Sequence, residues 1–451
     1  MNIHWPKIEI PEGIENMESY LRHLVEEGAK NKYGGIDTLI SARIDDELRA
    51  LKGFEPYFII LHHIVEVCNA NDIYVKAIYK NAACSIVNYC LGITIADPIR
   101  WGLPFERFRA ETDTSFPRIG LYVDWHQRKT FLYHLKEAFG WGYVTKVYDK
   151  FRQDGNFIHE SSNRIPVTCP NLVFIFDEPF EKAVGTIEAE DDDTYEMVDV
   201  PKYSKEILEE LGYVYVHFDF IDISDALLKE VEQDTGMKIN PEEIPLDDKE
   251  TFDNMADETS ESSFDPIWEK LLGEVKEKNE IGFWDLCNVL AIHYRSFADL
   301  YIERKKNGIL DNSVASPILK NTLGMLLYEE QIDEILRTVA GMDYREAEET
   351  RCALLSHDDK RIDASVETIM ERCHVRGLNQ KEAFHVLNLI MANVHTTSTF
   401  SHIICHALLT YRETWLRVHF PESYQKMREE RKRKTIEEDY ERYVDDDYSL
   451  M

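Results

Sequence analysis

Three side chains able to bind a metal are spaced for one face of a helix near the C-terminal end of the chain. His402, Cys405 and His406 lie at positions i, i+3 and i+4, and this spacing brings side chains together on a helix. Structural zinc sites use such nitrogen and sulfur ligands, but they need four of them. No fourth ligand accompanies this group, and its neighbours are apolar. We therefore expect a packed helix here rather than a metal site.

Two aspartates occur in a segment of alternating character, YVYVHFDF, and just after it. Asp219 and Asp222 are three residues apart, and side chains three apart on a strand point to opposite faces of the sheet. These two carboxylates therefore cannot easily share one magnesium ion.

The elements that must position these groups fall into two parts. The first is mixed, with short strands and amphipathic helices, and the second, from 224 to 424, is almost wholly helical. The pattern predicts an α+β fold with a small mixed sheet and packed helices, followed by a mostly α-helical domain. The strands are expected at 172–176 and 213–220, and the helices of the first part at 15–30, 44–70 and 126–140.

Composition indicates a folded, acidic protein. The 451 residues are 44% hydrophobic, and 84 acidic against 51 basic side chains give a formal net charge of -33. Such a surface repels a polyanion, so binding to nucleic acid is expected to be weak or absent. No apolar run is long enough to cross a membrane, and the first residues lack the order of a signal peptide. We expect a cytoplasmic protein with reduced cysteines and no membrane contact.

The negative charge is concentrated in three runs. Residues 177–199 and 242–265 each hold ten acids and one base, and residues 435–451 hold seven acids and one base. Like charges at this density repel one another and extend the chain. Solvated loops are therefore expected in the first two runs, and a charged, disordered tail over 426–451.

Several segments follow one another in a characteristic order along the chain. They are RIDDELRALKGFEPYFIILHHIVE (43–66), NYCLGITIADPIRWGLPFERFRAETDTSFP (88–117), LEELGYVYVHFDF (208–220), IPLDDKETFDNM (244–255), WDLCNVLAIHYRSFADLYIERKKNG (284–308), LGMLLYEEQIDEILRTVAGMDYREAEETR (323–351) and SHIICHALLTYRETWLRVHFPESY (401–424). Their order is similar to the palm and fingers of bacterial C-family DNA polymerases, the DNA polymerase III alpha subunits, over roughly residues 20–425. The resemblance implies a palm-like domain over 1–223 and a fingers-like domain over 224–425.

The metal ligands that the resemblance implies are mostly replaced. In this family three aspartates hold two magnesium ions, two from a Pro-Asp-x-Asp-x-Asp motif and one from a Phe-Asp-Phe strand. Aligned without a gap, the first motif is the stretch from Pro117, in which Gly120 and Tyr122 occupy the two ligand positions. Only Asp219 keeps its carboxylate. We therefore expect no intact catalytic residues, and neither a bound metal nor another cofactor.

We also expect the former metal site to be closed by packing. Tyr122 is large enough to fill the volume of two hydrated ions, and its hydroxyl can donate a hydrogen bond to Asp219. Arg118, His217 and Lys80 are further candidate partners of this carboxylate.

The nucleotide-binding residues that the resemblance implies are vestigial. The family's glycine-rich loop, which lets backbone N–H groups approach phosphates, corresponds to KAIYKNAACS (76–85), which contains no glycine. Lys76, Lys80 and Ser85 could still contact phosphate. In the fingers the retained positions are Tyr294, Arg295 and His402, whereas Phe400 replaces a lysine.

The thumb of the family is largely deleted. About two dozen residues, 149–171, stand where the family has several helices that grip the duplex. The family's N-terminal metallophosphoesterase-like domain and its C-terminal clamp-binding modules are likewise not expected in this sequence.

Three functions remain open. The first is a catalytically inactive alpha-subunit-like protein that acts through protein partners in DNA replication or repair. The second is a DNA-directed DNA polymerase or other nucleotidyltransferase with magnesium ligands moved to Asp124, Asp219 and Asp222. The third is an acidic DNA-mimic inhibitor built on the runs 177–199 and 242–265. We favour the first, because every replacement removes the same activity while core positions such as Phe58 are retained.

Overall fold

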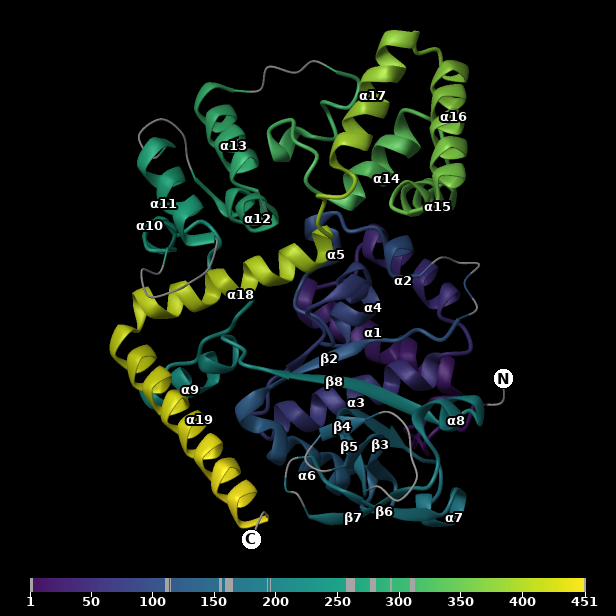
Figure 1. Cartoon of the computed structure of the whole chain (residues 1–451), viewed down its shortest axis with the longest axis vertical. Coiled ribbons are helices and arrows are strands. Elements are labelled where there is room, and N and C mark those ends of the chain that lie inside the picture. Colours follow the sequence, from purple (N-terminus) through teal and green to yellow (C-terminus); the bar gives the residue numbers. More distant parts are fainter. Residues whose placement is uncertain are drawn as a thin grey trace. The chain divides into compact units, whose positions relative to one another are not determined.

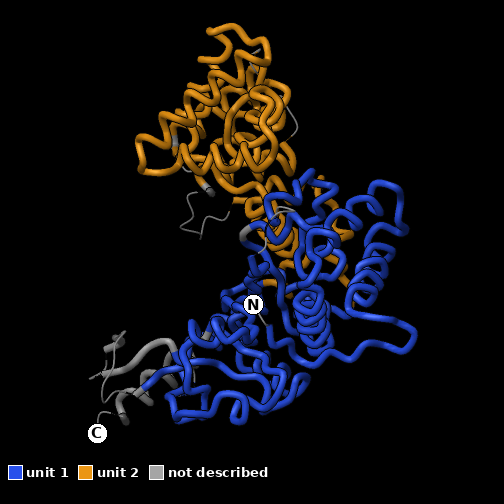
Figure 2. Tube along the Cα trace, turned by 90° about the vertical axis from the view of Figure 1, so that its right-hand side faces the viewer, with its two compact units in different colours: residues 1–236, 425–451 blue, residues 237–424 orange. Residues whose placement is uncertain are grey.

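The protein forms two compact units. The structure is a computed structural model, and it describes residues 3–109, 113, 115–153, 156–158, 165–192, 194, 196–256, 264–275, 281–292, 294–308 and 313–449. The first unit comprises residues 1–236 and 425–451, and the second comprises residues 237–424 (Figure 2). The unit boundary thus falls later than the expected 223/224, because α9 (Ala226–Thr235) buries Leu227, Leu228 and Val231 as part of the first unit.

The first unit is built on a mixed sheet of eight strands among the described residues. Its main path runs β1-β2-β8-β5-β3-β4, and β6 and β7 extend it from β5 (Figure 1). The pair β2–β8 is parallel, whereas β5–β8 and β3–β5 are antiparallel. The strands are β1 (Val75–Lys76), β2 (Gly120–Asp124), β3 (Val144–Gln153), β4 (Asn156–Ile158), β5 (Ile165–Ile175), β6 (Thr186–Glu190), β7 (Met197–Pro201) and β8 (Val214–Ile221).

Helices of the first unit pack against one face of this sheet, the face that carries Leu121 and Phe218. Apolar side chains of α3, such as Phe58 and Ile64, join Leu121 of β2 and Phe218 of β8 in one core, and burial of this kind supplies most of the stability of a fold. The expected helix 44–70 is two helices, which part at Gly53 with a φ of 90°. The helices are α1 (Met17–Tyr33), α2 (Thr38–Ala50), α3 (Glu55–Ala70), α4 (Ile86–Cys90), α5 (Pro98–Trp101), α6 (Arg128–Phe139), α7 (Phe180–Ala183), α8 (Lys205–Glu210) and α9.

Strands stand where the family resemblance places a thumb. The described part of 149–171 belongs to β3, β4 and β5 and contains no helix. The described residues of the acidic run 177–199 lie largely in a helix and two strands, so the expectation of a solvated loop is wrong for them. They form α7 and the hairpin β6–β7, and Lys146, only 8% exposed, lies 3.3 Å from Asp191 and 2.8 Å from Asp192. A buried lysine thus offsets the repulsion that was expected to extend this segment.

The second unit is helical over its described residues, as the sequence predicts. Capping boxes start two of its helices, at Asp343 with Glu346 and at Asn379 with Glu382, because each pair satisfies backbone N–H groups at a helix start. The run 242–265 contains a short helix, α10, capped by Asp248, and its residues 257–263 lie outside the described part. The helices are α10 (Lys249–Asp253), α11 (Phe264–Val275), α12 (Phe283–Ala291), α13 (Arg295–Asn307), α14 (Glu329–Thr338), α15 (Tyr344–Leu354), α16 (Asp359–Val375), α17 (Gln380–Asn393) and α18 (Phe400–His419).

The C-terminal segment is a helix rather than a disordered tail. Helix α19 (Pro421–Ser449) continues through the charged stretch, and from residue 425 it belongs to the first unit. Lys426 reaches Asp234 at 2.5 Å, and Arg431 is buried. Ion pairs with the first unit thus replace the solvation expected for this segment. Among the described residues no helix is long and apolar enough to cross a bilayer.

Candidate functional site

The three family ligand positions meet on the strands β2 and β8. In the parallel pairing, Gly120 lies opposite His217 and Tyr122 lies opposite Asp219. Alternate residues of a strand share a face, and these four are the less buried set, while Leu121 and its register partner point into the core. The sheet therefore brings the three positions compared with metal ligands onto the same, less buried face of the strand pair.

Tyr122, Asn171 and His217 surround the carboxylate of Asp219. Tyr122 is hydrogen-bonded to it, and burial together with this negative neighbour raises the pKa of the Tyr122 hydroxyl. Asn171 of β5 donates from Nδ2 to Asp219 Oδ1 at 3.2 Å, and His217 Nδ1 lies 3.5 Å from Asp219 Oδ2. The ring of Tyr79 packs edge-on against Tyr122 with centroids 4.5 Å apart. Aromatic packing and hydrogen bonds thus occupy this centre.

Arg118 and Lys80 were the other side chains expected to contact Asp219. Arg118 does not contribute, because its Nη2 pairs with Glu209 at 2.9 Å. The side chain of Lys80 lies outside the described part of the structure. Sequence reasoning missed Asn171, which no motif singles out.

A second group of carboxylates gathers at the carboxyl end of the same strands. Asp124 ends β2, Asp222 follows β8, and Glu230 belongs to α9. The guanidinium of Arg431 on α19 lies between them, with Nη1 3.0 Å from Asp124 and 2.9 Å from Asp222, and Nη2 2.9 Å from Glu230. The side chains of Asp124 and Arg431 are 0% and 4% exposed.

This arrangement bears on the magnesium ligands suggested at Asp124, Asp219 and Asp222. Burial raises the pKa of Asp124, and the nearby Arg431 opposes that effect. Asp124 and Asp222 therefore share an internal cation, whereas Asp219 is bonded to Tyr122 and Asn171. Within the described residues, no three His, Cys, Asp or Glu side chains are grouped so that they could hold a metal.

The residues of the former phosphate loop are engaged inside the first unit. Lys76 Nζ donates to the carbonyl of Gly92 at 2.7 Å. Ser85 caps α4, and its hydroxyl donates to Glu47 Oε2 at 2.6 Å. Glu47, which is 0% exposed, also accepts from the backbone N–H groups of Ile86 and Val87. An internal carboxylate thus takes the helix donors that a phosphate would need.

The fingers positions lie in the second unit. Tyr294 precedes α13 and is 53% exposed, whereas the side chain of Arg295 is outside the described part. His402 lies on α18, where burial and the neighbouring His406 lower its pKa to about 4. Phe400, at the former lysine position, is buried and stacks on Trp284 at 5.4 Å with nearly parallel rings.

Two family models match the chain. The model described as "Bacterial DNA polymerase III alpha NTPase domain" matches residues 19–152. The model described as "Bacterial DNA polymerase III alpha subunit finger domain" matches residues 221–377. Together the two matches cover well over half of the chain, and they fall in the order expected from sequence.

Curated relatives agree with these matches. A DNA polymerase III subunit alpha of Halalkalibacterium halodurans is 24% identical over 494 residues, which covers 93% of this chain and 43% of the relative. A DNA polymerase III subunit alpha of Staphylococcus aureus strain COL is 23% identical over 481 residues, which covers 92% of this chain and 45% of the relative. The chain spans less than half the length of these relatives.

Proposed function

Since this chain belongs to the C family of bacterial DNA polymerases, with a DNA polymerase III alpha-like palm and fingers region, we propose that it is a catalytically inactive member that acts through protein contacts. The partners proposed are proteins of the replication or repair machinery, and the compartment is the cytoplasm. Neither a metal nor a nucleotide is needed for this role.

The observation that carries the proposal is the pairing of Tyr122 with Asp219. Two-metal catalysis needs carboxylates that converge on both ions. At this position one carboxylate faces a phenol, and the neighbouring register pair is Gly120 with His217. Magnesium bound through one carboxylate would take its other ligands from water and phosphate, and Tyr122 occupies the adjacent space.

Changes at the nucleotide-binding positions support the same proposal. Glu47 caps the helix that follows the former phosphate loop, and Phe400 fills a former lysine position by stacking on Trp284. Meanwhile buried apolar residues of α1, α3, β2 and β8 pack in one core. Residues that would bind metal and nucleotide are replaced, whereas the core that maintains the fold is kept. This combination favours a role in which the fold binds partner proteins.

The two other functions have less support. A polymerase with magnesium ligands moved to Asp124 and Asp222 would first have to displace the guanidinium of Arg431. A DNA mimic would need the acidic charges of 177–199 to be displayed together; Glu188 and Asp199 are exposed, but Asp191 and Asp192 are largely buried against Lys146.

A primer-extension assay tests the proposal. With a labelled primer–template, all four deoxynucleotides and magnesium or manganese, we expect neither extension nor release of pyrophosphate. An active DNA polymerase III alpha subunit serves as the positive control. Extension by this protein that disappears in Asp219→Ala would contradict the proposal and favour the remodelled polymerase.

Affinity for DNA provides a second, independent measurement. With a net charge of -33, the protein should bind a primer–template at physiological salt with a Kd above ~1 μM, in the non-specific range. Fluorescence anisotropy at several salt concentrations measures this affinity. Nanomolar binding with a steep salt dependence would show that basic side chains form a groove for DNA, and the protein-contact role would lose support.

A further inference from the structure

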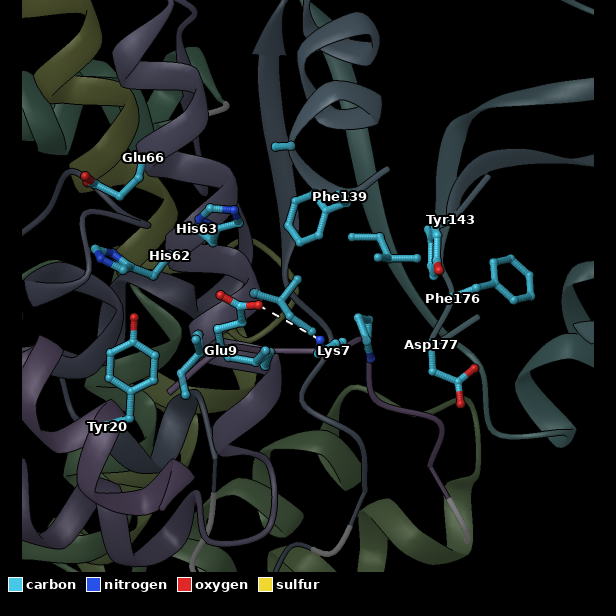
Figure 3. Close-up of a pocket in the computed structure, with 16 residues that line it drawn as sticks. Lys7, Glu9, Tyr20, His62, His63, Glu66, Phe139, Tyr143, Phe176 and Asp177 are labelled. Atoms are coloured by element: carbon cyan, nitrogen blue, oxygen red, sulfur yellow. Dashed lines mark ion pairs between the residues drawn. The ribbon is translucent and has the colours of Figure 1, made fainter. Parts of the chain in front are cut away.

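A groove opens in the first unit between the N-terminal segment and the helices α3 and α6. Its volume is about 550 Å³, within the range of roughly 300–1,000 Å³ that ligand pockets span. Figure 3 shows residues of the N-terminal segment, including Lys7 and Glu9, between the α3 side of the groove and the side formed by Phe139, Tyr143 and Phe176.

The apolar part of the lining, called the floor below, includes Ile8 and Phe139, which are half-buried. Both pack against the core cluster that contains the buried Ile59 and Ile60 of α3. Phe139 at the end of α6 packs edge-on against His63, with ring centroids 5.0 Å apart. The floor therefore offers a preformed surface for an aliphatic or aromatic side chain.

The rim of the groove is acidic. Glu9, Glu66 and Asp177 contribute carboxylates; Lys7 lies 3.9 Å from Glu9, and His4 Nδ1 lies 3.1 Å from Asp177 Oδ2. No ion pair joins Glu66 to another residue in the described part of the structure. Charges of this sign attract a cation and repel a phosphate.

The two histidines of the groove lie on α3. His62 Nδ1 is hydrogen-bonded to the carbonyl of Leu91 at 3.0 Å. Burial, and secondarily the neighbouring His62, lower the pKa of His63. With three carboxylates against Lys7, acidic side chains outnumber basic ones at the rim.

We propose that this groove binds a peptide segment of a partner protein in which an apolar or aromatic anchor lies next to lysine or arginine. The proposal rests on the protein-contact function above and specifies the chemistry of the partner. The apolar floor takes the anchor, and Glu9, Glu66 and Asp177 pair with the flanking cations. The overall charge of -33 adds long-range attraction for such a segment.

Direct binding of designed peptides tests this assignment. The probe is a fluorescein-labelled decapeptide with two adjacent aromatic residues flanked by lysines, and its counterpart carries glutamates in place of the lysines. We expect saturable binding of the basic peptide with a Kd of about 10–100 μM. The acidic counterpart should bind at least tenfold more weakly.

Blocking the groove without changing its charge separates a groove from a charged surface. Ala138 is an exposed residue in the last turn of α6 that lines the groove, so Ala138→Trp should obstruct it and weaken binding at least tenfold. The matched control is Ala70→Trp, at an exposed position in the last turn of α3 that does not line it. The control should bind as the unmodified protein does.

Charge reversal tests the rim. Glu9→Lys with Glu66→Lys should weaken binding of the basic peptide at least tenfold. Glu188→Lys with Asp199→Lys makes the same change on the exposed side of the hairpin β6–β7 and should change binding less than twofold. Circular dichroism of each variant checks that it is folded.

Three results would overturn the assignment: no saturable binding, equal losses in the groove variants and their controls, or competition by a deoxynucleoside triphosphate. None of them depends on primer extension. If the protein neither extends primers nor binds the peptide, the proposed function stands and the assignment of the groove as a peptide site fails. A protein that extends primers would lose the proposed function, whatever the peptide does.

Discussion

The strand pair β2–β8 stabilises negative charge differently at its centre, around Asp219, and at its carboxyl end, around Asp124. At the centre, Tyr122 faces Asp219 and Asn171 donates to it. At the carboxyl end, Asp124 and Asp222 share the guanidinium of Arg431. The first region holds one carboxylate among Tyr122, Asn171 and His217, and the second holds several carboxylates around a cation from a helix that is distant in sequence.

The two regions differ in how strongly each carboxylate depends on the side chain that pairs with it. Asp219 is 28% exposed, so water still solvates part of its charge. Asp124 is 0% exposed. Among the described residues, Arg431 Nη1 and the backbone N–H of Ile223 donate to its Oδ1, and its Oδ2 is buried without a hydrogen-bond partner. Removal of a partner should therefore cost little at the centre and much at the carboxyl end, because an uncompensated buried charge is expensive.

The largest expected effect is that of Arg431→Met. The substitution keeps an unbranched side chain but leaves Asp124, Asp222 and Glu230 without their shared cation. We expect the free energy of unfolding to fall by about 3–5 kcal/mol. Urea denaturation followed by circular dichroism measures the change.

Two further variants sharpen this measurement. Arg433→Met removes an exposed cation from the same helix and should cost less than about 0.5 kcal/mol. Adding Asp124→Asn to Arg431→Met should recover part of the loss, because the most buried charge is then removed. If Arg431→Met costs no more than Arg433→Met, the buried cation has no special role.

The next effect concerns the centre. Asp219→Ala removes the acceptor shared by Tyr122 and Asn171, so the free energy of unfolding should fall by about 1–2 kcal/mol. Added magnesium should leave the melting temperature unchanged in both proteins. A magnesium-dependent rise that is absent from Asp219→Ala would mean that the centre binds metal, and the contrast with the carboxyl end would be lost.

Sequence predicted one of the two strands of this centre, β8, and the positions compared with metal ligands on both; β2 was not among the expected strands. Alternation in the segment before Asp219 predicted β8, and an ungapped comparison with the family placed Tyr122 at a ligand position. Their direct pairing follows from the parallel register of the two strands. Asn171 was missed because it lies on β5, and its approach to Asp219 depends on the strand order of the sheet.

The role of the charged segments could not be predicted from local composition. A high density of like charge favours an extended chain, but Arg431 reaches Asp124 across 307 residues of sequence. Likewise, Lys146 neutralises Asp191 and Asp192 from another strand. In both cases tertiary ion pairs overcome a local preference, and only the fold specifies which charges meet.

The smallest expected effect is a dependence on alkaline pH that distinguishes the two regions. Burial and Asp219 raise the pKa of Tyr122 above its ordinary value of 10.0. Above pH 10 the unfolded chain therefore loses this proton before the folded chain does, so stability falls as the pH rises from about 10 towards the folded pKa.

Tyr122→Phe should remove this contribution. The difference in free energy of unfolding between the unmodified protein and Tyr122→Phe should shrink by about 0.5 kcal/mol between pH 8 and pH 10.5, a value that allows for solvent screening at a partly exposed side chain. Tyr294→Phe, at a 53% exposed tyrosine, is the control and should show less than half of that change. The cost of Arg431→Met should stay constant over the same range, because the ordinary pKa values of guanidinium and carboxyl groups lie outside it. A constant difference for Tyr122→Phe would mean that its hydroxyl ionises normally, and the centre would then not depend on its bond to Asp219.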